Sequence, residues 1–189
     1  MIDLAASLLL AGFASALYWN TLKNGFVFDD QLIYENPIIY NHRAGSMGFY
    51  SKESGRRSGW RYQLGKLYRD PRRIVFYTYE RDMERHSMKP LGWHATNIAI
   101  HAVNTVIVYA LCRGFSDTIP AIAGAAIFAS HPVATAAVAP ISGRSSTLCF
   151  TFYGLSLLSA WCGWWPLCLL MGAAAWRCRT DSRSPRACA

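Results

Sequence analysis

Two adjacent carboxylates, Asp29 and Asp30, follow the first apolar segment of the chain, in the run NGFVFDD at positions 24–30. A charged pair beside aromatic residues at a membrane surface is costly to build. Such a pair suits general-base chemistry, in which a carboxylate deprotonates an acceptor hydroxyl. We therefore take Asp29 and Asp30 as candidate catalytic residues. The structural alternative is that they cap a helix or order the loop through bonds to backbone N–H groups.

A phosphate-bearing substrate also needs cations that stabilise the departing phosphate. Arg144 is the first candidate, with Ser142 close before it as a further binding residue, and Arg72 and Arg73 come next. The guanidinium fork suits this role because it can make two hydrogen bonds to phosphate oxygens. The alternative for Arg144 is an interfacial anchor at the end of a helix.

Four polar residues recur at helical spacing within one apolar segment: His94, Asn97, His101 and Asn104. Their spacing places them on one helix face. Polar residues in a membrane helix usually face other helices or a cavity, so we expect this face to point into the bundle. It makes either helix–helix hydrogen bonds or part of a substrate cavity, for which we take His94 and Asn97 as binding candidates. Metal ligation ranks third, since no acidic partner lies nearby in sequence.

The composition is that of a polytopic membrane protein, with 52% hydrophobic and 16% charged residues in a chain of 189. Thirteen of the 19 Lys and Arg residues and eight of the 11 Asp and Glu residues lie between Lys23 and Lys89. The net charge of +8 therefore favours a loop that faces lipid headgroups or a phosphate-bearing lipid over nucleic acid. The six cysteines form no C-x-x-C pair and predict free thiols rather than a metal site.

The apolar segments of the chain predict an all-α membrane domain over residues 1–176, with four or five transmembrane or re-entrant helices and a long first loop. The N-terminal helix is expected to stay uncleaved, because Asp3 stands where a signal peptide carries positive charge. Pro132 breaks the third segment, and the last two are shorter than usual spans. The expected spans are 2–19, 91–111, 118–141, 148–161 and 165–176.

The loop at 20–90 alternates basic and aromatic residues between Trp60 and Arg85, a pattern typical of helices that lie in the membrane interface. The tail at 177–189 is basic and without periodicity, so we expect disorder. A count of Lys and Arg alone places the loop inside, but that rule weakens for loops longer than about 60 residues.

Three ordered runs, NGFVFDDQLIYENP, GWHATNIAIHAVN and HPVATAAVAPISGRSS, stand at the ends of these segments. Together they resemble the N-terminal membrane region of the transmembrane and tetratricopeptide-repeat proteins, a branch of the GT-C glycosyltransferases related to protein O-mannosyltransferases. The resemblance extends from about Leu17 to Leu158. In that family the His-Pro motif commonly continues to a glutamate, where this chain has Ala136, and the membrane part carries more helices.

The resemblance implies that the loop at 20–90 is extracytoplasmic and that its aspartate pair carries the catalytic carboxylate. It implies a donor sugar on a polyprenyl phosphate and a hydroxyl acceptor, and a divalent metal is possible as cofactor. The segment from His131 to Arg144 is expected near the same site, which adds His131 to the binding candidates. The alternative class is a non-catalytic membrane subunit that keeps this fold and docks its aromatic-basic loop on a larger complex.

Overall fold

The computed structural model describes residues 3–27, Asp30 and residues 73–179, without the side chains of Arg73 and Arg179. This part of the chain is helical throughout and contains no strand. Its elements are α1 (Leu4–Leu17), the short 3-10 helix η1 (Trp19–Lys23), α5 (Arg73–His86), α6 (Pro90–Arg113), α7 (Thr118–Ser130), α8 (Pro132–Val138), the 3-10 turn η3 (Ile141–Gly143), α9 (Arg144–Trp161) and α10 (Trp165–Arg179).

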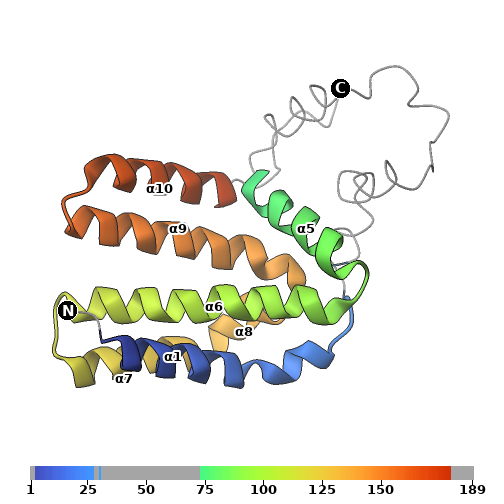
Figure 1. The fold of residues 1–189 in the computed structure, drawn as a ribbon, viewed down its shortest axis with the longest axis horizontal. Coiled ribbons are helices and arrows are strands. Elements are labelled where there is room, and N and C mark those ends of the chain that lie inside the picture. The colour runs from blue at the N-terminus through green and yellow to red at the C-terminus, as the bar shows by residue number, and fades with distance from the viewer. Residues whose placement is uncertain (1–2, 28–29, 31–72, 180–189) are drawn as a thin grey trace, which may run out of the picture.

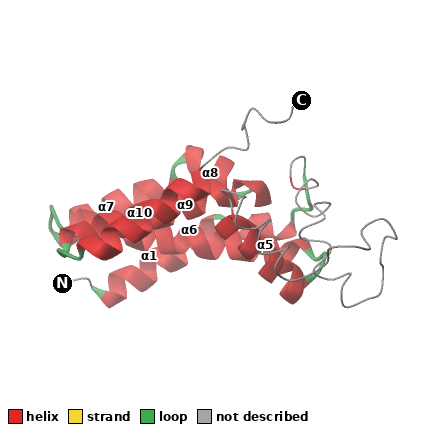
Figure 2. Cartoon of the chain, turned by 90° about the horizontal axis from the view of Figure 1, so that it is seen from above, coloured by secondary structure: helices red, strands yellow, loops and turns green. Residues whose placement is uncertain are grey.

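Helix α6 is the centre of the bundle and packs against α1, α7 and α9. Figure 1 shows α9 and α10 on one side of α6 and α1 and α7 on the other. Helix α5 contacts α6, α9 and α10 at one end of the bundle, and the view in Figure 2 shows it at this end as well. The layers therefore place α5, the start of α6 and the start of α9 close together.

The helix boundaries follow from capping groups and from proline. Asp3 caps α1 by accepting a hydrogen bond from the Ala5 N–H at 2.9 Å. Proline stands at the first position of α6 and of α8, where its missing N–H costs nothing. At Pro132 the chain bends by 57° between α7 and α8, as predicted for this break. Beyond α9, Gly163 adopts a φ of +76° in the turn to α10, a conformation that glycine adopts without strain.

One described helix, α6, is both long and apolar enough to cross a membrane, and the bent pair α7–α8 would make a second span if counted as one. Helix α1 is apolar but has only 14 residues. Its length of about 21 Å falls short of a hydrocarbon core of about 30 Å. The all-α fold is thus confirmed, while the larger number of four or five spans stays a prediction.

The polar stripe on α6 points into the bundle, as predicted, because His94, Asn97, His101 and Asn104 are all buried. Three of them bond to backbone carbonyls of other helices or turns. Asn97 Nδ2 donates to Pro140 O at 2.9 Å, Asn104 Nδ2 donates to Thr147 O at 2.9 Å, and His101 Nε2 lies 3.2 Å from Ala129 O. Most of the stripe therefore holds neighbouring elements against α6.

Helix α5 lies at the end of the stretch from Trp60 to Arg85 in which interfacial helices are expected. One of its faces is buried in a hydrophobic cluster with Trp93, Ile141 and Leu148, through Val75, Phe76, Tyr79 and Met83. The opposite face is exposed, as at Tyr77. Residues 31–72, which carry the remainder of the predicted interfacial pattern, lie outside the described residues, as does the tail from residue 180.

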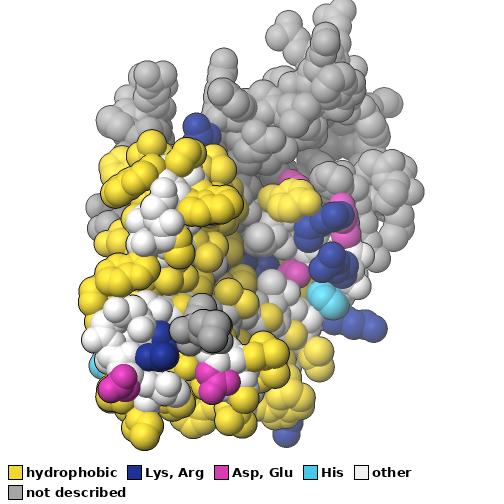
Figure 3. Space-filling model, turned by 60° about the vertical axis from the view of Figure 1, so that its left-hand side comes forward, with side chains coloured by type: hydrophobic (Ala, Val, Ile, Leu, Met, Phe, Trp, Pro, Cys, Tyr) yellow, Lys and Arg dark blue, Asp and Glu magenta, His cyan; other side chains and the backbone are white. Residues whose placement is uncertain are grey.

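The outer surface of the bundle is strongly apolar. Exposed large hydrophobic side chains occur on α1, α7 and α10, among them Leu4, Leu9, Ile119, Leu169 and Trp176. Figure 3 shows hydrophobic side chains covering much of the left-hand part of the view, with one group of charged side chains to the right and a few at the lower end. Contiguous apolar surface of this extent is typical of a surface covered by lipid or by other helices.

Candidate functional site

Asp30 is buried and is held by two backbone N–H groups. Its Oδ1 accepts from Ser142 N at 2.8 Å, and its Oδ2 accepts from Val27 N at 3.2 Å. The first bond joins residues 112 positions apart and fixes Asp30 on the turn η3. The expectation that the segment 131–144 lies near the aspartates is therefore met for Asp30, whereas Asp29 lies outside the described residues.

His94 lies one turn inside α6, and its ring is 1% exposed. Neither ring nitrogen has a hydrogen-bond partner among the residues that the structure describes. The backbone groups of Asn24, Gly25 and Ala139 and the carboxylate of Asp30 nevertheless lie close enough to interact with the ring. The imidazole is therefore a buried polar group beside the aspartate whose hydrogen bonds to the described residues are poorly aligned.

Arg144 begins α9, and no part of it is exposed. Its Nε donates to Asn97 Oδ1 at 2.7 Å, and its Nη2 donates to Trp93 O at 2.9 Å. The positive charge is balanced by Asp82 of α5, whose Oδ2 lies 2.6 Å from Nη2. The rings of Tyr79 and Trp93 cover the guanidinium, with centroids 4.7 Å and 5.9 Å from its central carbon. The charge expected to face a phosphate is thus fully enclosed by protein groups.

Asp82 is a member of this site that the sequence analysis did not identify. It is 3% exposed, and its Oδ1 accepts from Thr96 Oγ1 at 2.8 Å while its Oδ2 pairs with Arg144. A signal was present in the sequence, because Val75, Tyr79 and Asp82 share a helix face at spacings of four and three. An acid on the apolar face of an amphipathic helix predicts a buried partner.

The other predicted binding residues take different positions. Ser142 contributes its backbone N–H to Asp30. His131 is exposed and caps α8, with Nδ1 accepting from Val133 N at 3.2 Å. Arg72 lies outside the described residues, and Arg73 is placed at the start of α5 without its side chain. The structure therefore brings Asp30, His94, Asn97, Ser142 and Arg144 together and leaves His131 at a distance along α8.

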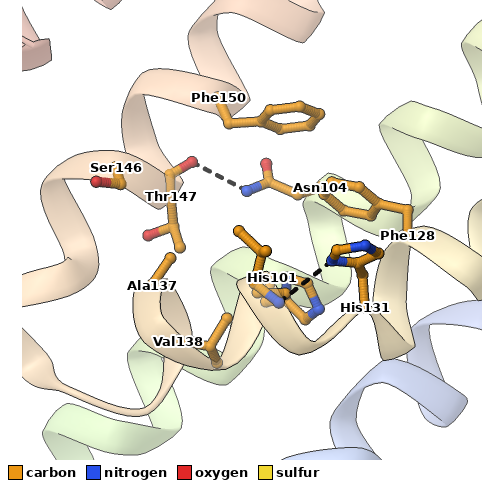
Figure 4. Close-up of a pocket in the computed structure, with 11 residues that line it drawn as sticks. His101, Asn104, Phe128, His131, Ala137, Val138, Ser146, Thr147 and Phe150 are labelled. Carbon is orange, nitrogen blue, oxygen red and sulfur yellow. Dashed lines mark hydrogen bonds between the residues drawn. The ribbon is translucent and has the colours of Figure 1, made fainter.

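His131 borders a cavity of about 340 Å³ that opens beside the bend between α7 and α8. Most of its lining is apolar and comes from α6, α7, α8 and α9. The rings of Phe128 and Phe150 stack with their centroids 5.0 Å apart. Figure 4 shows Asn104 donating to the backbone of Thr147 beside Phe150. A slender apolar chain would fit this lining.

The possible divalent metal stays a prediction. Within residues 3–27, at Asp30 and within 73–179, no group of three or more His, Cys, Asp or Glu side chains comes together.

No protein-family model and no solved structure matches the chain, but curated proteins do. Human protein O-mannosyl-transferase TMTC3 is 29% identical over 161 residues, which are 84% of this chain and 17% of the human protein. Caenorhabditis elegans protein O-mannosyl-transferase F38B6.6 is 31% identical over 156 residues, 80% of this chain and 22% of the relative. Drosophila melanogaster protein O-mannosyl-transferase Tmtc1 is 30% identical over 166 residues, 83% of this chain and 18% of the relative.

The chain spans about a fifth of the length of these relatives. The alignment covers four fifths or more of this chain and so takes in most of the bundle. The similarity to these relatives confirms the resemblance to the protein O-mannosyltransferases that the three sequence runs indicated. By both lines of evidence, the homologues of this chain are protein O-mannosyl-transferases.

Proposed function

We propose that the chain forms a multi-pass membrane unit of a GT-C-like glycosyltransferase, which transfers a sugar from a polyprenyl-phosphate donor to a hydroxyl acceptor. The observation that carries the proposal is the anchoring of Asp30 on η3. This contact fixes the aspartate run against the segment 131–144, where the resemblance expects the site. The similarity to protein O-mannosyl-transferases supports the same reaction class.

The two aspartates then have different tasks. Both oxygens of Asp30 accept backbone N–H groups, so Asp30 holds the loop in place. Its neighbour in sequence, Asp29, is left to take the proton from the acceptor hydroxyl. The acceptor oxygen then bonds to the anomeric carbon, the bond from that carbon to the phosphate oxygen breaks, and the lipid phosphate leaves with the electron pair. His94, whose ring nitrogens have no well-aligned hydrogen-bond partner among the described residues, binds a hydroxyl of the substrate.

The departing phosphate needs a positive charge that is not already neutralised. Arg144 is paired with Asp82, so Arg72 and Arg73 of the loop are the first candidates, and Arg144 serves only where Asp82 releases it. The apolar cavity beside His131 would receive part of the isoprenoid chain. The loop 20–90 faces the extracytoplasmic side, where it meets lipid headgroups.

A second function fits the same geometry. Asp30, Asn97 and Arg144 are all engaged in internal bonds, which is also what a non-catalytic scaffold requires. Such a subunit would keep the fold and use the aromatic-basic loop to bind a larger membrane complex.

The substitutions Asp29→Asn and Asp30→Asn in membranes that carry the full chain distinguish the two. We expect Asp29→Asn to lower mannose transfer from polyprenyl-phosphate mannose by about two to four orders of magnitude, the range for loss of a general base. Asp117→Asn is the matched control, because Asp117 is exposed at the start of α7 and makes no side-chain capping bond. Full activity of both variants, or wild-type membranes without transfer, would favour the scaffold.

A further inference from the structure

We infer that Asp82 is a positioning residue: from α5 it fixes, through Arg144 and Asn97, the turn whose backbone N–H holds Asp30. The inference rests on the proposed function, because it concerns the same aspartate loop. Among the described residues, Asp82 bonds to Thr96 and Arg144, whereas Asp30 bonds to Val27 and Ser142. The effect of Asp82 is relayed through the side chains of Arg144 and Asn97 and the backbone of residues 140–144.

The relay begins on α5, where Asp82 has two separate partners. One carboxylate oxygen accepts from the Thr96 hydroxyl of α6 at 2.8 Å, and the other pairs with Arg144 of α9 at 2.6 Å. One turn earlier on the same helix face, the Tyr79 hydroxyl donates to Ile141 O at 3.1 Å. Helix α5 therefore contacts η3 directly through the Tyr79 hydroxyl, and it contacts Arg144, the residue after η3, through the ion pair of Asp82.

Asn97 closes the relay from the α6 side. Its Oδ1 accepts from Arg144 Nε at 2.7 Å, while its Nδ2 donates to Pro140 O at 2.9 Å. The side-chain amide of Asn97 thus binds both Pro140, the residue before η3, and Arg144, the residue after it. Between these two ties, the Ser142 N–H donates to Asp30 at 2.8 Å.

Removing the charge of Asp82 leaves the guanidinium of Arg144 without its counter-ion. A buried charge without a partner is strongly unfavourable, so Arg144 must turn toward another acid or toward water. We expect either movement to break the bond between Arg144 and Asn97 and so to weaken the hold on residues 140–144, where the bonds of Asn97 to Pro140 O and of Tyr79 to Ile141 O remain. Gly143 makes this turn especially sensitive, because a Cβ there would lie 2.3 Å from Ala137 O, which shows how closely the turn packs on α8.

The experiment measures how readily a maleimide reaches residue 142 in the turn η3. In full-length protein with Ser142→Cys, which keeps the backbone N–H, we compare maleimide labelling of residue 142 with and without Asp82→Asn, well below the melting temperature. Native Cys162 is exposed and serves as the internal reference in peptide mass spectra. We expect Asp82→Asn to raise the labelling of residue 142 about tenfold relative to Cys162, as the turn opens locally.

Glu84→Gln is the matched control, since Glu84 lies on the same helix but pairs with Arg81 at an exposed position. If Asp82→Asn lowers the melting temperature without changing the labelling of residue 142, Asp82 is merely structural and the inference is wrong. Equal labelling of residue 142 in the Asp82→Asn and Glu84→Gln variants would overturn the inference as well. If Asp82→Asn does not fold, Thr96→Val removes one Asp82 bond and leaves the ion pair, and we expect a smaller rise in labelling with it.

Activity separates this inference from the proposed function. If the chain transfers sugar, Asp82→Asn should lower kcat and leave KM unchanged, because both oxygens of Asp82 are held by protein partners and its role is to position the turn, and Asp82→Glu should restore part of the rate. If wild-type protein transfers nothing, the proposed function fails. The labelling of residue 142 still decides whether Asp82 positions the turn.

Discussion

Arg144 shows how much a single buried side chain does in this bundle. It bonds to Asn97 and the Trp93 carbonyl, pairs with Asp82, and has the stacked rings of Tyr79 and Trp93 beside its guanidinium. Lysine cannot replace this set, since an ammonium group lacks the planar fork that spans several acceptors. The charge is what holds three helices at one point.

Arg144→Met should therefore lower the free energy of unfolding by about 3–5 kcal/mol, because it leaves Asp82 buried and unpaired. Adding Asp82→Leu removes the orphaned carboxylate, and the double variant should recover part of this loss. Arg81→Met is the control at an exposed ion pair and should leave unfolding nearly unchanged. Denaturation of purified protein in mild detergent gives the free energies of unfolding of the wild type and the three variants. A double variant less stable than Arg144→Met would contradict this explanation.

Helices α6 and α9 approach each other closely at a glycine. A Cβ on Gly154 would lie 2.5 Å from Ile107 Cγ2, and the β-branched isoleucine has little freedom to move away. On α1, a Cβ on Gly12 would meet no atom within 4 Å. The two positions are therefore a matched pair of helical glycines with opposite surroundings.

Gly154→Ala should destabilise the protein by about 1–3 kcal/mol through overpacking. Gly12→Ala should be neutral or stabilise by up to about 1 kcal/mol through helix propensity. Thermal unfolding of the two variants in the same detergent tests this. Equal melting temperatures would show that α6 and α9 separate without cost.

Elements with local signals were predictable from the sequence, and contacts between them were not. The stripe from His94 to Asn104 lies within one continuous helix, so its spacing alone placed it in the bundle. The break at Pro132 is equally local. Asp82 and Arg144 belong to different helices, and only the packing of α5 on α6 and α9 makes them partners. For the same reason, the sequence suggested a free cation at Arg144 where the structure has a neutralised one.

The whole molecule combines an apolar outer surface with a polar end near α5. Helix α6 is about 36 Å long at 1.5 Å per residue, enough to cross a hydrocarbon core of about 30 Å. As a membrane span, α6 would have its two ends on opposite sides of the bilayer. The site around Asp30 lies at the end where α6 begins.

Cysteines on the two sides of α6 test this orientation in intact cells. Ser51→Cys, in the loop before α6, should react with an impermeant maleimide, whereas Ser116→Cys, just after α6, should be protected until the membrane is opened. The substitutions add no charge, so they do not alter the topology signals. Protection of residue 51 together with labelling of residue 116 would reverse the proposed orientation.

The relay through Arg144 also sets an order in biosynthesis. Chains emerge from the ribosome N-terminal end first, so Asp30, Asp82 and Asn97 are made before Ser142 and Arg144. Until residue 144 emerges, Asp82 has no counter-ion and Asp30 lacks the Ser142 N–H. A nascent chain halted before this point carries an aspartate loop that nothing on η3 restrains, so the site is completed only after the beginning of α9 has been made.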